Sequence, residues 1–274
     1  MQKTLSARIR ARLRSDWAYV ALLSVCTAFC LTSGICFIAA GEARNALLML
    51  AFAFFPALLV ILEAALRMRL PTLFVALCMV MPVGNLLGSC FDLYSAIPFF
   101  DDILHTVSGF VFACLGFGFL SRLIGRPHDA KTFAGCLLCG FAFSMAVAAI
   151  WEMIEYVGTE IGGMDMQEDT VITGFGSYLL SGTHSEIVSV EGITQTVIYY
   201  GDGESLVISG YLDIGLIDTV CDMFVCLIGD IVFVAVTCVV WAADRSLLDV
   251  YIPHAAGEEA SDAAVGADDA AEAA

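Results

Sequence analysis

The sequence has little charge, and especially little positive charge. Charged residues make up 15% of its 274 residues and only 12 are Lys or Arg, whereas a soluble domain carries roughly 25% charged residues. A nucleic-acid interface needs clustered basic side chains, so we expect no nucleic-acid partner. No Lys or Arg occurs at residues 158–213 or after Arg245, and the net charge is −17.

The sequence also lacks a disulfide framework and a recognisable zinc signature. None of its 11 cysteines falls in the polar stretch 158–213, where disulfides would be expected, and all lie in or beside apolar runs. They are typical of small buried hydrophobic residues. Cys136-x-x-Cys139 has no second pair to complete a four-ligand zinc site, and no His-Glu-x-x-His motif is present.

Long apolar runs are the dominant feature. Hydrophobic residues make up 59% of the chain and the mean hydropathy is +0.86. Several runs approach the ~20 residues that span a bilayer. We therefore predict an all-α polytopic membrane protein, a bundle of six transmembrane helices. The spans are expected at 17–40, 45–66, 71–90, 103–124, 132–157 and 214–241.

The positive residues predict the orientation of this bundle. Residues 1–16 form a basic N-terminus, and with six spans 11 of the 12 positive residues fall on the same side as that N-terminus; only Arg44 falls on the other. Basic residues favour the cytoplasmic side. Both termini are therefore expected in the cytoplasm, with 158–213 as an external loop. Residues 242–274 are expected to form an acidic, disordered cytoplasmic tail.

The loop 158–213 is unusually long for a connection within a helix bundle, and such loops are often functional or structured. Asp202-Gly203 lies between the β-favouring runs 196–199 and 206–208, which predicts a β-hairpin. The many acids of the loop are read first as a solvated surface, and second as a cation site.

Two features of the apolar spans predict packing rather than chemistry. Glu63 precedes Arg67 by four residues, so the two can form an ion pair on one helix face. Gly109, Gly116 and Gly118 in the fourth span are typical of close helix contacts.

Three spans carry acids or a histidine at helical spacing. Ionisable groups at membrane depth are costly and are functional-site hypotheses by default. In the predicted topology all three sets lie near the outer boundary, and each set is spaced i,i+3 or i,i+4, so that its members share a helix face. We therefore expect them to converge. The groups are Asp101, Asp102, His105, Glu152, Glu155, Asp218 and Asp222, with Tyr156 next to the fifth span's pair.

Carboxylates held this close cannot all stay ionised without help. Either some are protonated or a cation binds among them. One imidazole and several carboxylates suit a divalent ion such as Mg, Mn or Zn, and a bound ion could activate water or polarise a phosphoryl oxygen. Glu152, Glu155 and His105 are the candidates for proton transfer. The candidate metal ligands are Asp102, His105, Glu152, Asp218 and Asp222. A purely structural hydrogen-bond network is the alternative.

These motifs resemble those of the YjdF-type family of bacterial inner-membrane proteins, whose activity is unassigned. The resemblance covers roughly 45–241 and rests on the segments 100–110, 151–156, 163–170 and 213–229. It implies a location in the bacterial plasma membrane. A looser similarity is to VanZ-like membrane proteins, from which the chain departs by having Cys226 in place of an asparagine and Asp230 after Gly229.

The leading hypothesis is a metal-dependent hydrolase that acts on a lipid or envelope-precursor headgroup. A transporter coupled to protons or cations is one alternative, favoured by Asp230, which lies deeper in the sixth span. An envelope scaffold or sensor, with a purely structural polar network, is the other.

Overall fold

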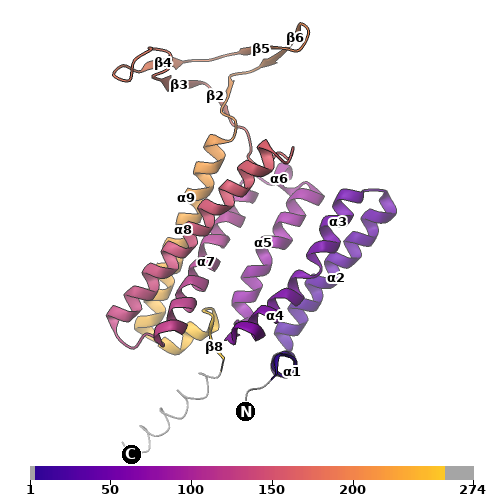
Figure 1. Cartoon of the computed structure of the whole chain (residues 1–274), viewed down its shortest axis with the longest axis vertical. Coiled ribbons are helices and arrows are strands. Elements are labelled where there is room, and N and C mark those ends of the chain that lie inside the picture. The colour runs from indigo at the N-terminus through magenta and orange to yellow at the C-terminus, as the bar shows by residue number, and fades with distance from the viewer. Residues whose placement is uncertain (1–3, 257–274) are drawn as a thin grey trace, which may run out of the picture. The chain divides into compact units, whose positions relative to one another are not determined.

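The structure is a computed structural model that describes residues 4–256. Within that range six helical segments are long and apolar enough to cross a membrane, which confirms the predicted fold class. Figure 1 shows the order of the elements. The segments are Trp17–Ala40, Ala43–Leu66, Thr72–Phe91, Phe100–Ile124, Ala130–Glu160 and Leu216–Ala243, each beginning and ending within three residues of its predicted bounds.

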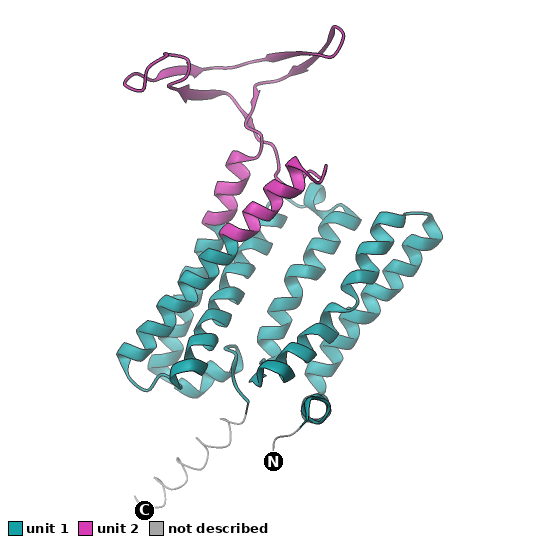
Figure 2. Cartoon of the chain, in the orientation of Figure 1, with its two compact units in different colours: residues 1–148, 225–274 teal, residues 149–224 magenta. Residues whose placement is uncertain are grey.

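The chain divides into two compact units, which are described one at a time. Residues 1–148 and 225–274 form the first unit, and residues 149–224 form the second (Figure 2). Two helices, α8 (Ala130–Glu160) and α9 (Leu216–Ala243), have residues in both units.

The first unit holds most of the helices. α1 (Leu5–Ser15) precedes α2 (Trp17–Ala40), and Asp16 between them caps α2 by accepting a hydrogen bond from Tyr19 N at 3.0 Å. The second span is broken into two helices near Pro56, which lies at the start of α4. The remaining elements are α3 (Ala43–Phe52), α4 (Phe55–Leu66), β1 (Met68–Arg69), α5 (Thr72–Phe91), α6 (Leu93–Ala96), α7 (Phe100–Ile124), η1 (Arg245–Val250) and β8 (His254–Ala255).

Helix α7 is the most buried of the six spans, since half of its most apolar stretch is buried. Glycines permit the close approach of its neighbours. A Cβ on Gly109 would lie 2.2 Å from the carbonyl oxygen of Cys226 in α9, and one on Gly229 would lie 2.0 Å from that of Thr106. Gly116 makes a similar contact with Gly140 of α8. The prediction of close packing from the α7 glycines is confirmed.

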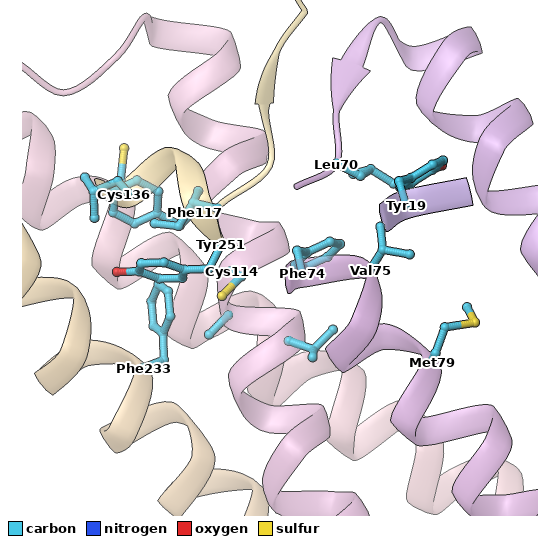
Figure 3. Packing of buried hydrophobic residues seen from close by; sticks show 14 of the residues in the cluster. Tyr19, Leu70, Phe74, Val75, Met79, Cys114, Phe117, Cys136, Phe233 and Tyr251 are labelled. Atoms are coloured by element: carbon cyan, nitrogen blue, oxygen red, sulfur yellow. The ribbon is translucent and has the colours of Figure 1, made fainter. Parts of the chain in front are cut away.

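The hydrophobic core of this unit joins residues from α2, α5, α7, α8, α9 and η1. Phe117 packs edge-on against Phe233, with 6.1 Å between ring centroids. Figure 3 shows these two rings close to Tyr251. Phe74, Val75, Cys114 and Cys136 are also almost fully buried. Cys114 and Cys136 thus act as small apolar side chains, whereas Cys36, Cys221 and Cys238 are exposed. The eleven cysteines, all within residues 4–256, form no disulfide.

The prediction of an ion pair between Glu63 and Arg67 is wrong, because Glu63 forms its ion pair with Arg12 of α1. Nε of Arg12 donates to Oε1 of Glu63 at 2.8 Å, and the Tyr19 hydroxyl donates to Oε2 at 2.8 Å. Arg12 and Glu63 are 7% and 4% exposed. Arg67 instead ends α4 in the left-handed region at φ 55°, and this turn carries its side chain out of the i,i+4 position.

The prediction of a disordered tail from residue 242 onward is wrong for its first part, which is ordered. Residues 245–250 form η1, and β8 pairs antiparallel with β1, with Arg69 opposite His254. His254 is buried, with its Nδ1 3.1 Å from the carbonyl oxygen of Ile252. This segment is ordered as far as Ala256 because it packs against the core. Nothing in the sequence indicated this packing, since the segment has no apolar periodicity. Residues 257–274, the rest of that tail, lie outside the described residues.

The second unit contains the ends of α8 and α9 and the segment between them. The predicted hairpin is confirmed: β5 (Thr196–Tyr200) pairs antiparallel with β6 (Glu204–Ile208). Its turn has three residues, with Gly201 and Gly203 at φ 56° and 101°, where glycine is favoured. The other strands are β2 (Val171–Ile172), β3 (Gly174–Ser177), β4 (Val188–Glu191) and β7 (Tyr211–Leu212), which pair β2 with β7 and β3 with β4.

Candidate functional site

Three carboxylates meet inside the second unit. Glu152 and Glu155 lie near the end of α8, and Asp222 lies near the start of α9. One oxygen from each side chain lies within 4.8 Å of the other two. The three residues are 5%, 8% and 2% exposed. The structure thus brings together acids that are 70 residues apart in the sequence, in a group that could hold a metal ion.

The helical spacing of the two glutamates explains why both reach Asp222. Residues three apart lie on one face of an α-helix, and that face of α8 is buried, while Trp151, Met153 and Ile154 between and beside them are at least 40% exposed. The indole Nε1 of Trp151 donates to Oε1 of Glu155 at 2.8 Å. This bond holds the Glu155 carboxylate in one orientation.

The carboxylates repel one another strongly if all three are ionised. Two unit charges 4.8 Å apart interact by about 3.5 kcal/mol at an effective dielectric constant of ~20. Three such pairs amount to roughly 10 kcal/mol by the same estimate. A cation or bound protons must therefore offset this charge.

A short segment of the loop braces the two helix ends beside this cluster. The hydroxyl of Thr159 accepts hydrogen bonds from Met166 N and Gln167 N, and the amide of Gln167 donates to Thr219 Oγ1 at 2.6 Å. Asp213 accepts from Thr170 N and from Ile217 N, both at 2.7 Å. Asp213 therefore anchors the loop and satisfies an N–H at the start of α9.

Asp218 belongs to this bracing rather than to the three-carboxylate group. Its Oδ2 accepts a hydrogen bond from Glu168 N at 2.9 Å. Tyr156 is 57% exposed, although it follows Glu152 by four residues on α8. Neither Asp218 nor Tyr156 is among the three residues whose carboxylate oxygens lie within 4.8 Å of one another.

The histidine motif lies in the first unit, at the start of α7. Nε2 of His105 is 3.5 Å from Oδ2 of Asp101, as i,i+4 spacing predicts. His105 is 8% exposed, and its Nδ1 lies 3.8 Å from Sγ of Cys226. Cys226 also donates to the His105 carbonyl oxygen. Asp102 is half-buried and lies in the first turn of α7, where the helix dipole stabilises a negatively charged carboxylate.

Asp230 is the most deeply buried acid of the first unit, with an exposure of 0%. The Ser144 hydroxyl lies beside its carboxyl but donates to the Gly109 carbonyl oxygen at 2.9 Å. Neither Asp230 oxygen has a hydrogen-bond partner of ordinary geometry among the described residues. Groups from three helices, Gly109 of α7, Ser144 of α8 and Asp230 of α9, thus lie close together.

Residues 18–243 match the family described as "Predicted membrane protein (DUF2238)". The chain belongs to the DUF2238 family. The match covers all six apolar helices and agrees with the YjdF-type resemblance, since YjdF-type is a name within DUF2238. No curated protein and no solved structure matches the chain. The looser VanZ similarity is unsupported by these comparisons.

Sequence reasoning missed three contributors to the polar sites of this DUF2238 protein. Trp151 was in the motif, but its hydrogen bond to Glu155 was not predicted. Cys226 was read as a small apolar residue and Ser144 was not singled out, yet each contacts one of the buried polar groups. Only the i,i+4 relation of Trp151 to Glu155 could have revealed one of them.

Proposed function

We propose that Glu152, Glu155 and Asp222 bind a divalent cation and that the protein is a membrane-embedded, metal-dependent hydrolase. The observation that carries the proposal is the convergence of three buried carboxylates within 4.8 Å. At metal–oxygen distances of about 2.1 Å, adjacent ligands of one ion lie about 3 Å apart. Small side-chain rotations would bring the three oxygens to that spacing.

The donor set favours a hard ion. Carboxylates suit Mg and Mn and also bind Zn. A bound ion supplies Lewis acidity or an activated water. Glu155, whose orientation Trp151 fixes, is the proposed general base, and Glu152 and Asp222 are the proposed ligands. Lipids are the molecules most accessible to a polar site within the membrane. A lipid or envelope-precursor headgroup is therefore the proposed substrate class.

The test is a metal titration of the purified protein in detergent, read by isothermal calorimetry with Mn²⁺ and with Zn²⁺. We expect Glu152→Gln and Asp222→Asn each to weaken metal binding at least about tenfold. Removing even a residue that only supports a metal ligand typically lowers metal affinity by about 10–100-fold. Glu160→Gln removes the same charge from an exposed position of α8 and is the matched control.

Two further variants define the ligand set. Asp218→Asn should leave the affinity within about threefold, because its carboxylate serves a backbone N–H. His105→Ala tests the sequence-based expectation that an imidazole is a further ligand. Absence of binding in the wild type, or equal losses in Glu160→Gln and Glu152→Gln, contradicts the metal site. Metal binding without turnover of phospholipid or lipid-linked phosphate substrates contradicts the hydrolase.

Asp230 supports a second candidate, a proton-coupled transporter. Asp222 and Asp230 are eight residues apart on α9, about 12 Å at 1.5 Å per residue. A carboxyl buried among three helices is the kind of group that relays protons in transporters. In this case Asp230→Asn abolishes proton-dependent uptake in proteoliposomes and leaves metal affinity unchanged, whereas uptake that persists in Asp230→Asn removes the argument.

A further inference from the structure

Asp230 of α9 is an acid enclosed in the interior of the first unit. Its exposure is 0%, and both carboxyl oxygens, Oδ1 and Oδ2, are buried without a hydrogen-bond partner among the described residues. An ionised carboxylate in such surroundings is far more costly than one that is paired. The group therefore needs a positive charge beside it, either a proton or another cation.

The basic side chains of the three surrounding helices lie too far away to supply that charge. α9 contains no Lys or Arg, and those of α7 and α8 are Arg122 and Lys131. Arg122 is 13 residues from Gly109 and Lys131 is 13 residues from Ser144, which is about 20 Å along each helix at 1.5 Å per residue. A cation that balances Asp230 must therefore come from outside these helices.

The single imidazole of these helices already has an acid beside it. His105 precedes Gly109 by one turn of α7, and its Nε2 lies 3.5 Å from Oδ2 of Asp101. A proton on this ring would be balanced by the Asp101 carboxylate. His105 is therefore a counter-charge for its own helix partner.

Ser144 of α8 presents an acceptor to the Asp230 carboxyl group. A serine hydroxyl has one proton, and Ser144 donates it to the Gly109 carbonyl oxygen of α7 at 2.9 Å. The same hydroxyl lies beside Asp230, so the lone pairs of Ser144 Oγ are what it offers to the carboxyl oxygens. Acceptor oxygens that face one another in a buried site need a cation between them.

The arrangement fits a monovalent metal ion better than it fits a proton. A proton resides on one oxygen and leaves the other carboxyl oxygen of Asp230 without a partner. A metal ion can contact both of these oxygens and Ser144 Oγ, and carboxylate and hydroxyl oxygens suit hard cations. One carboxylate balances one positive charge, so a divalent ion would leave net charge inside an apolar bundle. Oxygen ligands within helix bundles hold Na⁺ in known transporters.

The backbone contacts around the pair favour the smaller of the common monovalent ions. A Cβ on Gly109 would lie 2.2 Å from the Cys226 carbonyl oxygen, and one on Gly229 would lie 2.0 Å from that of Thr106. These contacts set how far α7 is from α9, next to Asp230. Because selectivity between ions depends on the size and flexibility of the site, a site held by such close contacts accepts Na⁺ more readily than K⁺.

We propose that Asp230 and Ser144 form a Na⁺ site in the first unit. Asp230 supplies the charge and two oxygen ligands, Ser144 Oγ supplies a third, and the Gly109 carbonyl oxygen orients the Ser144 hydroxyl. The functional meaning of the site rests on the transporter candidate, which it deepens by naming Na⁺, in place of a proton, as the ion that Asp230 holds. Binding of the ion is independent of the hydrolase.

The experiment follows the thermal unfolding midpoint of the full chain in detergent while NaCl replaces choline chloride at constant ionic strength. Na⁺ should raise the wild-type midpoint by about 3 °C or more once its concentration is about tenfold above Kd, and KCl should raise it less. Asp230→Asn removes the charge and should abolish the Na⁺ response. Ser144→Ala removes one ligand and should weaken Na⁺ binding about tenfold.

Two matched variants control for the substitutions themselves. Asp222→Asn makes the same change elsewhere on α9, and Ser121→Ala removes a buried hydroxyl near the end of α7. Both should keep the wild-type Na⁺ response. Equal responses to NaCl and choline chloride in the wild type overturn the site, as does a response that is lost in Asp222→Asn and kept in Asp230→Asn. If Asp230→Asn fails to fold, the comparison of Ser144→Ala with Ser121→Ala decides.

Uptake into proteoliposomes separates the ion site from the transporter. Na⁺ stabilisation that depends on Asp230 and Ser144, without ion-dependent uptake, keeps the Na⁺ site and overturns the transporter. Proton-driven uptake in a protein that Na⁺ does not stabilise keeps the transporter and overturns the Na⁺ site.

Discussion

Single charged side chains decide how α1 is attached to the first unit. Asp16 is the clearest case, because it caps α2 and accepts bonds from Thr72 and Arg12. Burial alone would raise its pKa, but the hydrogen bonds from Thr72, Tyr19 N and Arg12 outweigh that effect and lower the pKa from 3.8 to about 2. Its ionised form therefore stabilises the folded state.

The pH dependence of this contribution follows from the direction of the shift. A lowered pKa in the folded state adds stability above pH 4 and loses it as the pH falls toward 2. Asp16→Asn keeps the helix cap but removes the charge. We expect it to lower the unfolding midpoint at pH 7 and to unfold much more like the wild type near pH 2.5, as measured by thermal denaturation in detergent. An equal difference at both pH values would show that the charge of Asp16 has no part in stability.

At the scale of elements, contacts between helices depend on glycine. At Gly109 and Gly229, α7 and α9 are close enough that an added Cβ would meet backbone atoms, which cannot move aside as a flexible side chain can. The same contacts position Cys226 against His105 and bring Ser144 to the Gly109 carbonyl oxygen. The close approach of the α7 and α9 backbones therefore determines where the polar side chains of His105, Cys226 and Ser144 lie.

Substitution of Gly229 by Ala tests this packing. The new Cβ would lie 2.0 Å from the Thr106 carbonyl oxygen, so we expect a loss of about 1–3 kcal/mol, typical of overpacking. Gly135→Ala is the control, because no atom lies within 4 Å of its added Cβ and Ala favours a helix by up to about 1 kcal/mol. Thermal or denaturant unfolding measures both. A Gly229→Ala protein as stable as Gly135→Ala would contradict the close contact.

The β5–β6 hairpin is the element on which the scaffold alternative depends. It exposes Tyr199 and Tyr200, at 80% and 52%. If the protein acts by binding an envelope partner through this hairpin, deleting residues 196–208 abolishes partner capture and Glu152→Gln does not. If the protein is an enzyme at the carboxylate cluster, Glu152→Gln abolishes activity, and the deletion leaves metal affinity within about threefold.

At the scale of the whole molecule, we predict that both termini lie on one side of the membrane, because the number of apolar helices within residues 4–256 is even. The six apolar helices of the described residues and the distribution of basic residues agree on this arrangement. Epitopes inserted at the C-terminus and at Gly201 test it in intact cells. The Gly201 epitope should be accessible to antibody from outside, and the C-terminal epitope should become accessible only after permeabilisation. Accessibility of both without permeabilisation would contradict the predicted orientation.

The sequence by itself determined the class of protein, the six spans and the hairpin, because these depend on local composition and periodicity. Apolar runs of bilayer length and glycines in a tight turn need no information from distant residues. The sequence also identified Glu152, Glu155 and Asp222 as site candidates, because acids in apolar spans are costly.

Only the tertiary structure decided which partner each polar group has. Glu63 lies four residues from Arg67, yet it pairs with Arg12, because the left-handed turn at residue 67 and the docking of α1 outweigh helical spacing. Asp218 and Asp222 are four residues apart and so lie on one face of α9. Asp218 nevertheless accepts a hydrogen bond from the N–H of Glu168 in the loop, whereas Asp222 lies beside the glutamates of α8. Such choices depend on contacts between residues far apart in the chain, which local patterns do not encode.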